Sequence, residues 1–93
     1  MSSKPLFELG QIVTTPGALD ALETSGVNPL DLIKRHVSGD WGEVPPEDAQ
    51  ENDFSVKEGY RILSAYTVGD GVKIWIITEA DRSATTFLLP DDY

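Results

Sequence analysis

The strongest constraint on the fold is a pair of strand-forming segments joined by a tight turn in the C-terminal third. Residues 60–68 (YRILSAYTV) and 72–78 (VKIWIIT) are rich in β-branched and aromatic residues, and Gly69-Asp70-Gly71 separates them. An Asp-Gly pair between two such runs is among the strongest short-range signals for a β-hairpin. Nearly every position of residues 72–78 is apolar, which is typical of a strand near the centre of a sheet.

Two further segments extend the sheet. Residues 83–89 (SATTFLL) follow a turn over residues 79–82 and end at Pro90, which stops a strand. Residues 6–14 alternate loosely and contain Gly10, so they predict a short irregular first strand or an N-terminal arm. The sheet should therefore contain three or four strands.

Two short helices are predicted between these segments. Thr15-Pro16 and Asn28-Pro29 each combine a capping side chain with a proline suited to the first helical position. Glycines at positions 26 and 39 suit the ends of the two helices.

The expected fold is a single α+β domain over residues 1–93, in the order β-α-α-β-β-β. The helices should pack on one face of an antiparallel sheet, because alternating strands need a cover for their apolar face. The predicted core consists of Leu19, Leu22, Leu30, Ile33, Val37, Ile62, Ile74, Ile76, Phe87 and Leu89.

Charge and composition exclude several classes of function. Seven Lys and Arg against sixteen Asp and Glu give a net charge of −9, which opposes binding to nucleic acid or an anionic membrane. The absence of cysteine excludes zinc–thiolate sites, disulfides and thiol nucleophiles. No apolar run approaches the roughly 20 residues of a membrane span, so a cytoplasmic location is expected. No metal or cofactor is expected either, because the single histidine and scattered carboxylates lack zinc spacing and the calcium-loop pattern.

Residues 40–54 (DWGEVPPEDAQENDF) are predicted to form a long acidic loop, in which Pro46 could begin a single helical turn. An exposed aromatic among carboxylates suits a basic, partly apolar protein partner. The acidity has a simpler alternative role, which is to keep a small protein soluble and monomeric. The expected partner-binding residues are Asp40, Trp41, Glu43, Glu47, Asp48, Glu51 and Asp53.

A second group of residues could carry chemistry. His36 is the only histidine, and a further constellation of Arg61, Arg82, Ser83, Thr85 and Thr86 lies in or beside the predicted strands. A histidine can act as a general acid or base, and a guanidinium can stabilise a phosphate. The structural alternative is that His36 favours a helix C-terminus and that the others complete turns and strands.

Most of the chain resembles a family of small uncharacterised proteins of bacterial plasmids and other mobile elements. This resemblance implies a mobile-element context and supplies no activity. The segments that carry it are Phe7–Val13, Thr15–Leu19, Arg35-His36, Gly39–Gly42, Arg61–Tyr66 and Trp75–Ser83.

The order of helices, Arg-His pair and three-stranded meander is also similar to the barnase–colicin–RelE-like ribonuclease superfamily. That likeness implies His36 as general acid or base, Arg61 and Arg82 as phosphate ligands, and Thr78 or Thr85 as an orienting hydroxyl. The net charge and the lack of a second acid–base residue depart from that pattern.

Two functional hypotheses follow. The first is a non-enzymatic accessory protein of a mobile element that binds a basic protein through its acidic surface, for example to antagonise host defence. The alternative is a metal-independent ribonuclease that uses His36 and Arg82.

Overall fold

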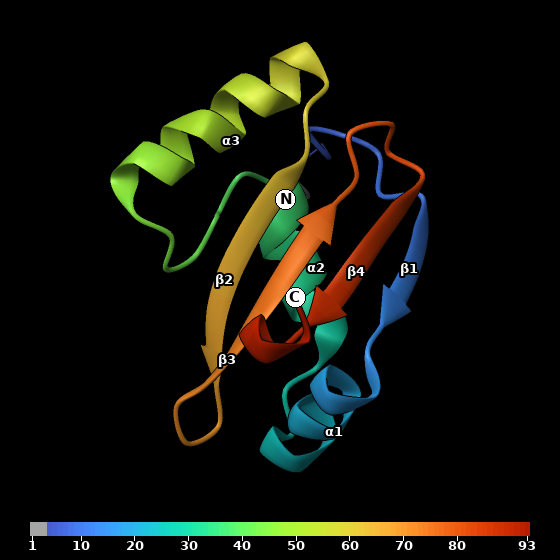
Figure 1. Cartoon of the computed structure of the whole chain (residues 1–93), viewed down its shortest axis with the longest axis vertical. Coiled ribbons are helices and arrows are strands. Elements are labelled where there is room, and N and C mark those ends of the chain that lie inside the picture. The colour runs from blue at the N-terminus through green and yellow to red at the C-terminus, as the bar shows by residue number, and fades with distance from the viewer. Residues whose placement is uncertain (1–3) are drawn as a thin grey trace.

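The computed structural model describes residues 4–93 and confirms the α+β class (Figure 1). The four strands lie in the order β1-β4-β3-β2. In chain order the elements are β1 (Gln11–Thr14), α1 (Pro16–Ser25), α2 (Pro29–Val37), α3 (Pro46–Glu58), β2 (Ile62–Val68), β3 (Val72–Thr78), β4 (Ala84–Leu88) and the 3₁₀ helix η1 (Pro90–Asp92).

The predicted hairpin forms, but the sheet is mixed rather than wholly antiparallel. β2, β3 and β4 are antiparallel neighbours, with Ala65 opposite Trp75 and Ile76 opposite Phe87. β1 pairs in parallel with β4. The long connection from β1 through the helices and the β2–β3 hairpin allows this parallel return, which a short turn could not make.

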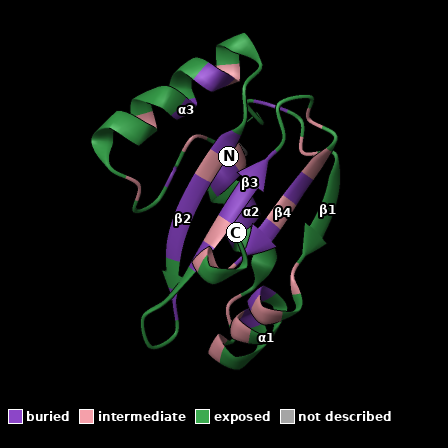
Figure 2. Cartoon of the chain, in the orientation of Figure 1, coloured by how far each residue is buried: buried purple, intermediate pink, exposed green. Residues whose placement is uncertain are grey.

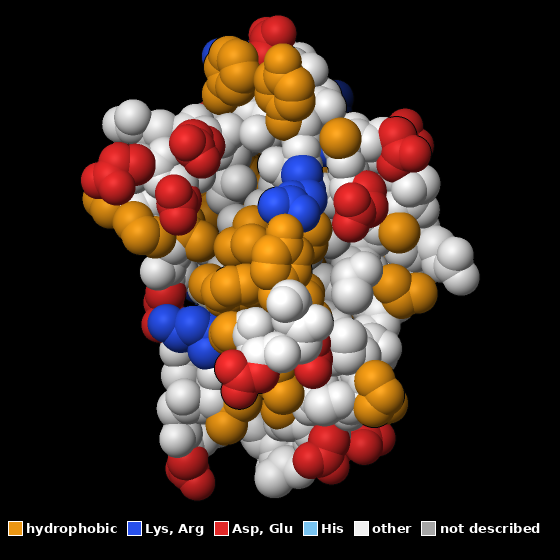
Figure 3. Space-filling view, in the orientation of Figure 1, with side chains coloured by type: hydrophobic (Ala, Val, Ile, Leu, Met, Phe, Trp, Pro, Cys, Tyr) orange, Lys and Arg blue, Asp and Glu red, His pale blue; other side chains and the backbone are white. Residues whose placement is uncertain are grey.

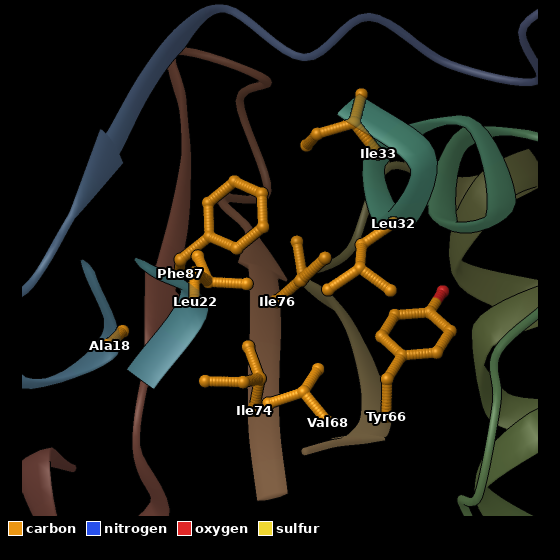
Figure 4. Packing of buried hydrophobic residues seen from close by; sticks show 9 residues of the cluster. All are labelled: Ala18, Leu22, Leu32, Ile33, Tyr66, Val68, Ile74, Ile76 and Phe87. Atoms are coloured by element: carbon orange, nitrogen blue, oxygen red, sulfur yellow. The ribbon is translucent and has the colours of Figure 1, made fainter. Parts of the chain in front are cut away.

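In Figure 1, α2 lies behind the sheet and α1 lies at its lower end. The predicted caps are present: Thr15 Oγ1 accepts the Ala18 amide at 3.2 Å and Asn28 Oδ1 accepts the Leu30 amide at 3.0 Å. The buried cluster joins these helices to β2, β3 and β4 (Figure 4). Its members are Ala18, Leu22, Leu32, Ile33, Tyr66, Val68, Ile74, Ile76 and Phe87.

The predicted core was correct in the sheet and partly wrong in the helices. Leu19 and Leu30 are exposed, whereas Ala18 and Leu32 are buried in the corresponding turns. Val37 and Leu89 are half-buried. In α1 the buried pair is Ala18 and Leu22, four residues apart, so the inward face is rotated from the predicted Leu19–Leu22 pair.

The predicted acidic loop over residues 40–54 was wrong for most of its length, because α3 begins at Pro46. Pro46 occupies the first turn, Glu47 and Asp48 favour the positive end of the helix dipole, and Gly59 ends the helix at φ 79°. The buried residues of α3 are polar, Asn52 and Ser55. Hydrophobic periodicity therefore could not reveal this helix.

α3 and the segment before it occupy the outer edge of β2. Asn52 Nδ2 donates to the Leu63 carbonyl at 2.7 Å, and the Leu63 amide donates to Asn52 Oδ1 at 3.2 Å. Further along, the Ala65 amide donates to the Trp41 carbonyl at 3.1 Å, and the Glu43 amide donates to the Ala65 carbonyl at 2.7 Å. These bonds satisfy the edge that β2 would otherwise leave open.

Gly42 allows this close approach. It has φ 74°, and a Cβ at this position would collide with the Ala65 carbonyl oxygen. Residues 41–43 can therefore lie against β2 only with glycine at position 42.

We predict that Asn52→Leu lowers the free energy of unfolding by about 2–4 kcal/mol, because it leaves the Leu63 amide and carbonyl unpaired. Urea denaturation of both proteins measures the difference. Gln50→Leu, at an exposed position of the same helix, is the matched control and should change stability by no more than about 0.5 kcal/mol. Equal stability of the two variants would show that the amide does not support the β2 edge.

Candidate functional site

His36, the first candidate catalytic residue, is fully buried beneath the sheet. Its Nδ1 lies 2.6 Å from Ser64 Oγ on β2, and its Nε2 lies 2.9 Å from Thr78 Oγ1 on β3. Thr78 Oγ1 in turn lies 2.8 Å from Thr85 Oγ1 on β4. The likeness to the ribonuclease superfamily implied His36 with Thr78 or Thr85 in one site, and the structure brings all three together. Ser64 had no local signal, because its partner lies 28 positions away.

The donor in each hydrogen bond of this chain follows from the last bond, which joins Thr85 to Leu9. Thr85 Oγ1 donates its one hydrogen to the Leu9 carbonyl at 2.7 Å, so it must accept from Thr78. Thr78 must then accept from His36 Nε2–H, which leaves Nδ1 to accept the Ser64 hydroxyl hydrogen. The chain is complete only with a neutral imidazole.

The surroundings of His36 also favour the neutral form. The Phe7 ring meets the imidazole edge-on at 5.2 Å between centroids, and the Trp41 ring does so at 6.0 Å. Burial lowers the pKa of His36 to about 4. A ribonuclease needs an acid–base group within reach of its substrate, so this buried histidine does not support that hypothesis.

Arg82 is likewise committed to the fold. Its guanidinium donates to the carbonyls of Tyr60 at 2.7 Å, Ser55 at 2.9 Å and Glu79 at 3.2 Å. It thereby joins the end of α3 to the β3–β4 turn. Its backbone has φ 60°, which is uncommon for a non-glycine residue.

The other proposed phosphate ligand, Arg61, lies apart from this network. Its guanidinium lies over the ring of Tyr93, 5.4 Å from the centroid. Tyr93 also meets Trp75 at 5.9 Å, next to η1, which Figure 1 shows on the face opposite α2. The candidate catalytic residues therefore do not converge on one accessible cleft.

Three of the predicted partner-binding acids are engaged within the chain. Asp40 accepts from Arg35 Nε at 2.7 Å, and this hydrogen bond lowers the pKa of Asp40. Glu43 accepts from Thr67 Oγ1 at 2.8 Å, which lowers the pKa of Glu43, and it lies 3.6 Å from Lys73 Nζ. Asp53 accepts from Trp41 Nε1 at 3.0 Å.

Trp41 was expected to be an exposed contact residue, and this prediction was wrong. Its side chain is 6% exposed and stacks with Phe7 at 6.2 Å between ring centroids. The hydrogen bond to Asp53 satisfies its one polar group. Trp41 therefore belongs to the core that surrounds His36.

The remaining acids form a surface on α3. Glu47, Glu51, Phe54 and Glu58 recur at i, i+4, i+7 and i+11, which places them in one row on the exposed side of the helix. Figure 3 shows acidic side chains gathered over α3. We define the α3 surface as Glu47, Asp48, Glu51, Phe54, Glu58 and Tyr60.

An exposed aromatic pair ends this surface. The rings of Phe54 and Tyr60 stack at 5.8 Å and 17°, and these residues are 57% and 56% exposed. The sequence did not indicate this pair, because Phe54 was expected to hold the acidic loop against the core and Tyr60 to begin a strand. Both expectations were wrong. Large apolar groups left in water beside carboxylates are a feature of protein-binding surfaces.

No acid of the α3 surface takes part in an ion pair within the described residues. Residues 4–93 contain two ion pairs, Arg35–Asp40 and Lys73–Glu43, and neither includes an acid of this surface. A recess of about 220 Å³ lies beside it, lined by Asp48, Glu51, Asn52, Ser55, Arg61 and Leu63. The recess is large enough for one side chain, and its lining combines the carboxylates of Asp48 and Glu51 with the guanidinium-bearing Arg61.

No family model, curated protein or solved structure matches this chain. Within the part of the chain that the structure describes, no helix is long and apolar enough to cross a membrane. Across residues 4–93, no cluster of His, Asp and Glu side chains is placed to hold a metal ion. The α3 surface, with its row of carboxylates and its exposed aromatic pair, is the candidate site.

We predict that acid destabilises the protein through His36. The pKa of the imidazole is about 6.5 in the unfolded chain and about 4 in the folded chain. The contribution of the neutral imidazole to the free energy of unfolding is therefore complete above pH 6.5 and is lost as the pH falls toward 4. At pH 5 the free energy of unfolding should be lower by about 2 kcal/mol through this group. Urea denaturation measures it, and NMR gives the pKa of the only imidazole directly.

His36→Gln is the matched variant for this prediction. This variant should have a lower free energy of unfolding at neutral pH. Between pH 6.5 and 5 it should also lose the part of the pH dependence of that free energy that belongs to the imidazole. An NMR midpoint near 6.5, or an unchanged slope in the variant, would contradict the buried neutral histidine.

Proposed function

We propose that this chain is a non-enzymatic interaction protein that binds an arginine-bearing basic protein through the α3 surface. The observation that carries the proposal is the stacked Phe54–Tyr60 pair, more than half exposed and in line with the carboxylates of Glu51 and Glu58. A guanidinium can stack on an aromatic ring while it donates two hydrogen bonds to a carboxylate. The α3 surface offers both groups within one helical turn.

The electrostatics support a cationic partner. Glu47 and Glu51 are four residues apart on one helix, and such like-charge pairs destabilise a helix by a few tenths of a kcal/mol. A bound cation would relieve this repulsion. The net charge of −9 would also steer a basic partner toward the molecule at low ionic strength.

The α3 surface is held rigidly, which lowers the entropy cost of binding. Asn52 fixes the middle of α3 to β2 through its two bonds with Leu63. Arg82 fixes the last turn of α3 through the Ser55 carbonyl and the segment that follows it through the Tyr60 carbonyl. The backbone that carries Phe54 and Tyr60 is therefore fixed relative to the sheet.

The resemblance to mobile-element proteins extends this proposal to a biological setting. A cytoplasmic host protein that binds nucleic acid carries Lys and Arg side chains for phosphates. The carboxylate row of α3 would occupy such a basic surface in place of the phosphates. This proposal makes the chain an antagonist of a host defence protein.

We predict that the protein binds a fluorescent arginine-rich peptide more tightly than a lysine-rich peptide of equal length and charge. Only the planar guanidinium both stacks and forms paired bonds with a carboxylate. Fluorescence anisotropy measures both affinities, and both should weaken between about 0.05 and 0.5 M salt. Equal affinities for the two peptides would contradict the role of the aromatic pair.

Two variants separate the contribution of the Phe54 ring to binding from that of the carboxylates. Phe54→Ala should weaken arginine-peptide binding about 2- to 5-fold and reduce the preference over lysine. The double variant Glu47→Gln/Glu51→Gln should weaken the binding of the arginine-rich and the lysine-rich peptide equally. Asp20→Asn/Asp70→Asn makes the same charge change at two exposed acids outside α3. If this control weakens binding equally, net charge rather than the α3 surface holds the peptide.

A further inference from the structure

The two edges of the sheet differ in a way that the proposed function does not explain. The β2 edge is occupied by Asn52 and by residues 41–43, as described above. The β1 edge has β4 on one side and no strand on the other, and Figure 2 shows β1 exposed along its length. Ile12 and Val13 are 48% and 39% exposed there.

The β1 edge is short, at four residues, but it lacks the charged side chains and prolines that otherwise prevent strand pairing. Proteins protect open edges with charged side chains, prolines or bulges. Residues 11–14 (QIVT) contain no charge and no proline, and the uncharged stretch runs from Leu9 to Leu19 in a chain of net charge −9. Two copies can therefore approach here without like charges at the point of contact, whereas α3 surfaces would repel each other.

The outward backbone groups of β1 can be identified from its pairing with β4. The Gln11 amide donates to the Ser83 carbonyl and the Thr15 amide to the Phe87 carbonyl, both at 2.9 Å. Backbone direction alternates along a strand, so Val13 also faces β4, while Ile12 and Thr14 direct their amides and carbonyls away from the sheet.

This pattern is complementary to itself. In an antiparallel pair of two β1 strands, Ile12 of each copy lies opposite Thr14 of the other and exchanges both backbone bonds with it. The two Val13 residues then face each other across the two-fold axis, as a close apolar pair without backbone bonds between them. Every outward group between residues 12 and 14 gains a partner.

We infer that two copies of this chain associate through antiparallel β1–β1 pairing and form one continuous eight-stranded sheet. The contact is short, so the dimer is weak, with a dissociation constant in the micromolar to millimolar range. Because α3 lies along the opposite edge, at β2, the dimer carries its two α3 surfaces at the far ends of the joined sheet. The association does not depend on the proposed function of α3.

The first test is the concentration dependence of the full chain. Analytical ultracentrifugation up to about 1 mM should show a monomer–dimer equilibrium. Added salt should strengthen it by screening the repulsion between two molecules of charge −9, the opposite of the salt effect on a basic partner. A monomer at every concentration would overturn the inference.

Amide hydrogen exchange gives a residue-specific test without any substitution. The Ile12 and Thr14 amides should become protected as the protein concentration rises, while the Val13 amide, paired with β4, should be protected throughout. A dimer that leaves the Ile12 and Thr14 amides unprotected would use another surface and would overturn the inference.

Charge substitutions at Val13 test the two-fold axis. Val13→Lys should weaken the dimer about 10-fold, because like charges then face each other. Leu30→Lys, at an exposed position on α2, is the control and should leave association unchanged. A mixture of Val13→Lys and Val13→Asp chains should associate more tightly than either alone. If Leu30→Lys disrupts the dimer equally, or the mixture shows no gain, the axis is not at Val13.

Discussion

The structure depends on one buried hydrogen-bond chain that requires a neutral histidine. It joins the Leu9 carbonyl, Thr85, Thr78, His36 and Ser64, and thus the N-terminal segment, three strands and α2. Each hydroxyl donates once, so the chain satisfies its members without a buried charge. A histidine beside a serine is also found in active sites. Here, however, no member of the chain is accessible to a substrate. Burial and donor order, rather than residue type, therefore assign this cluster to stability.

A second constraint places the α3 surface. Its buried face is polar, and α3 is held by amide and guanidinium bonds to backbone groups rather than by a hydrophobic row. Such bonds have strict geometry, so the helix has one position along the β2 edge. The outer side is then free to carry carboxylates and the Phe54–Tyr60 pair without a cost to the core.

The parts of the fold that could be predicted are those encoded locally. The helix starts at Thr15 and Asn28 and the Asp70-Gly71 hairpin each depend on a few adjacent residues. α3 could not be recognised because Asn52 acts on Leu63, eleven positions away, and periodicity reports only apolar faces. The parallel placement of β1 and the engagement of Arg82 by three carbonyls are likewise tertiary. The contact of His36 with Thr78, and of Thr78 with Thr85, is also tertiary, and only the burial of the three residues reveals that they support the fold.

The two edges of the sheet present different chemical groups. Its β2 edge is filled by the chain itself, and the structure there presents charge and aromatic rings on a helix. Its β1 edge presents uncharged backbone groups from a stretch without a single ionisable side chain. A charge excess of −9 opposes self-association wherever carboxylates would meet, so an uncharged edge is where a second copy can be accommodated. The acidity that would favour the proposed basic partner at α3 would therefore restrict the inferred self-association to the opposite edge of the sheet.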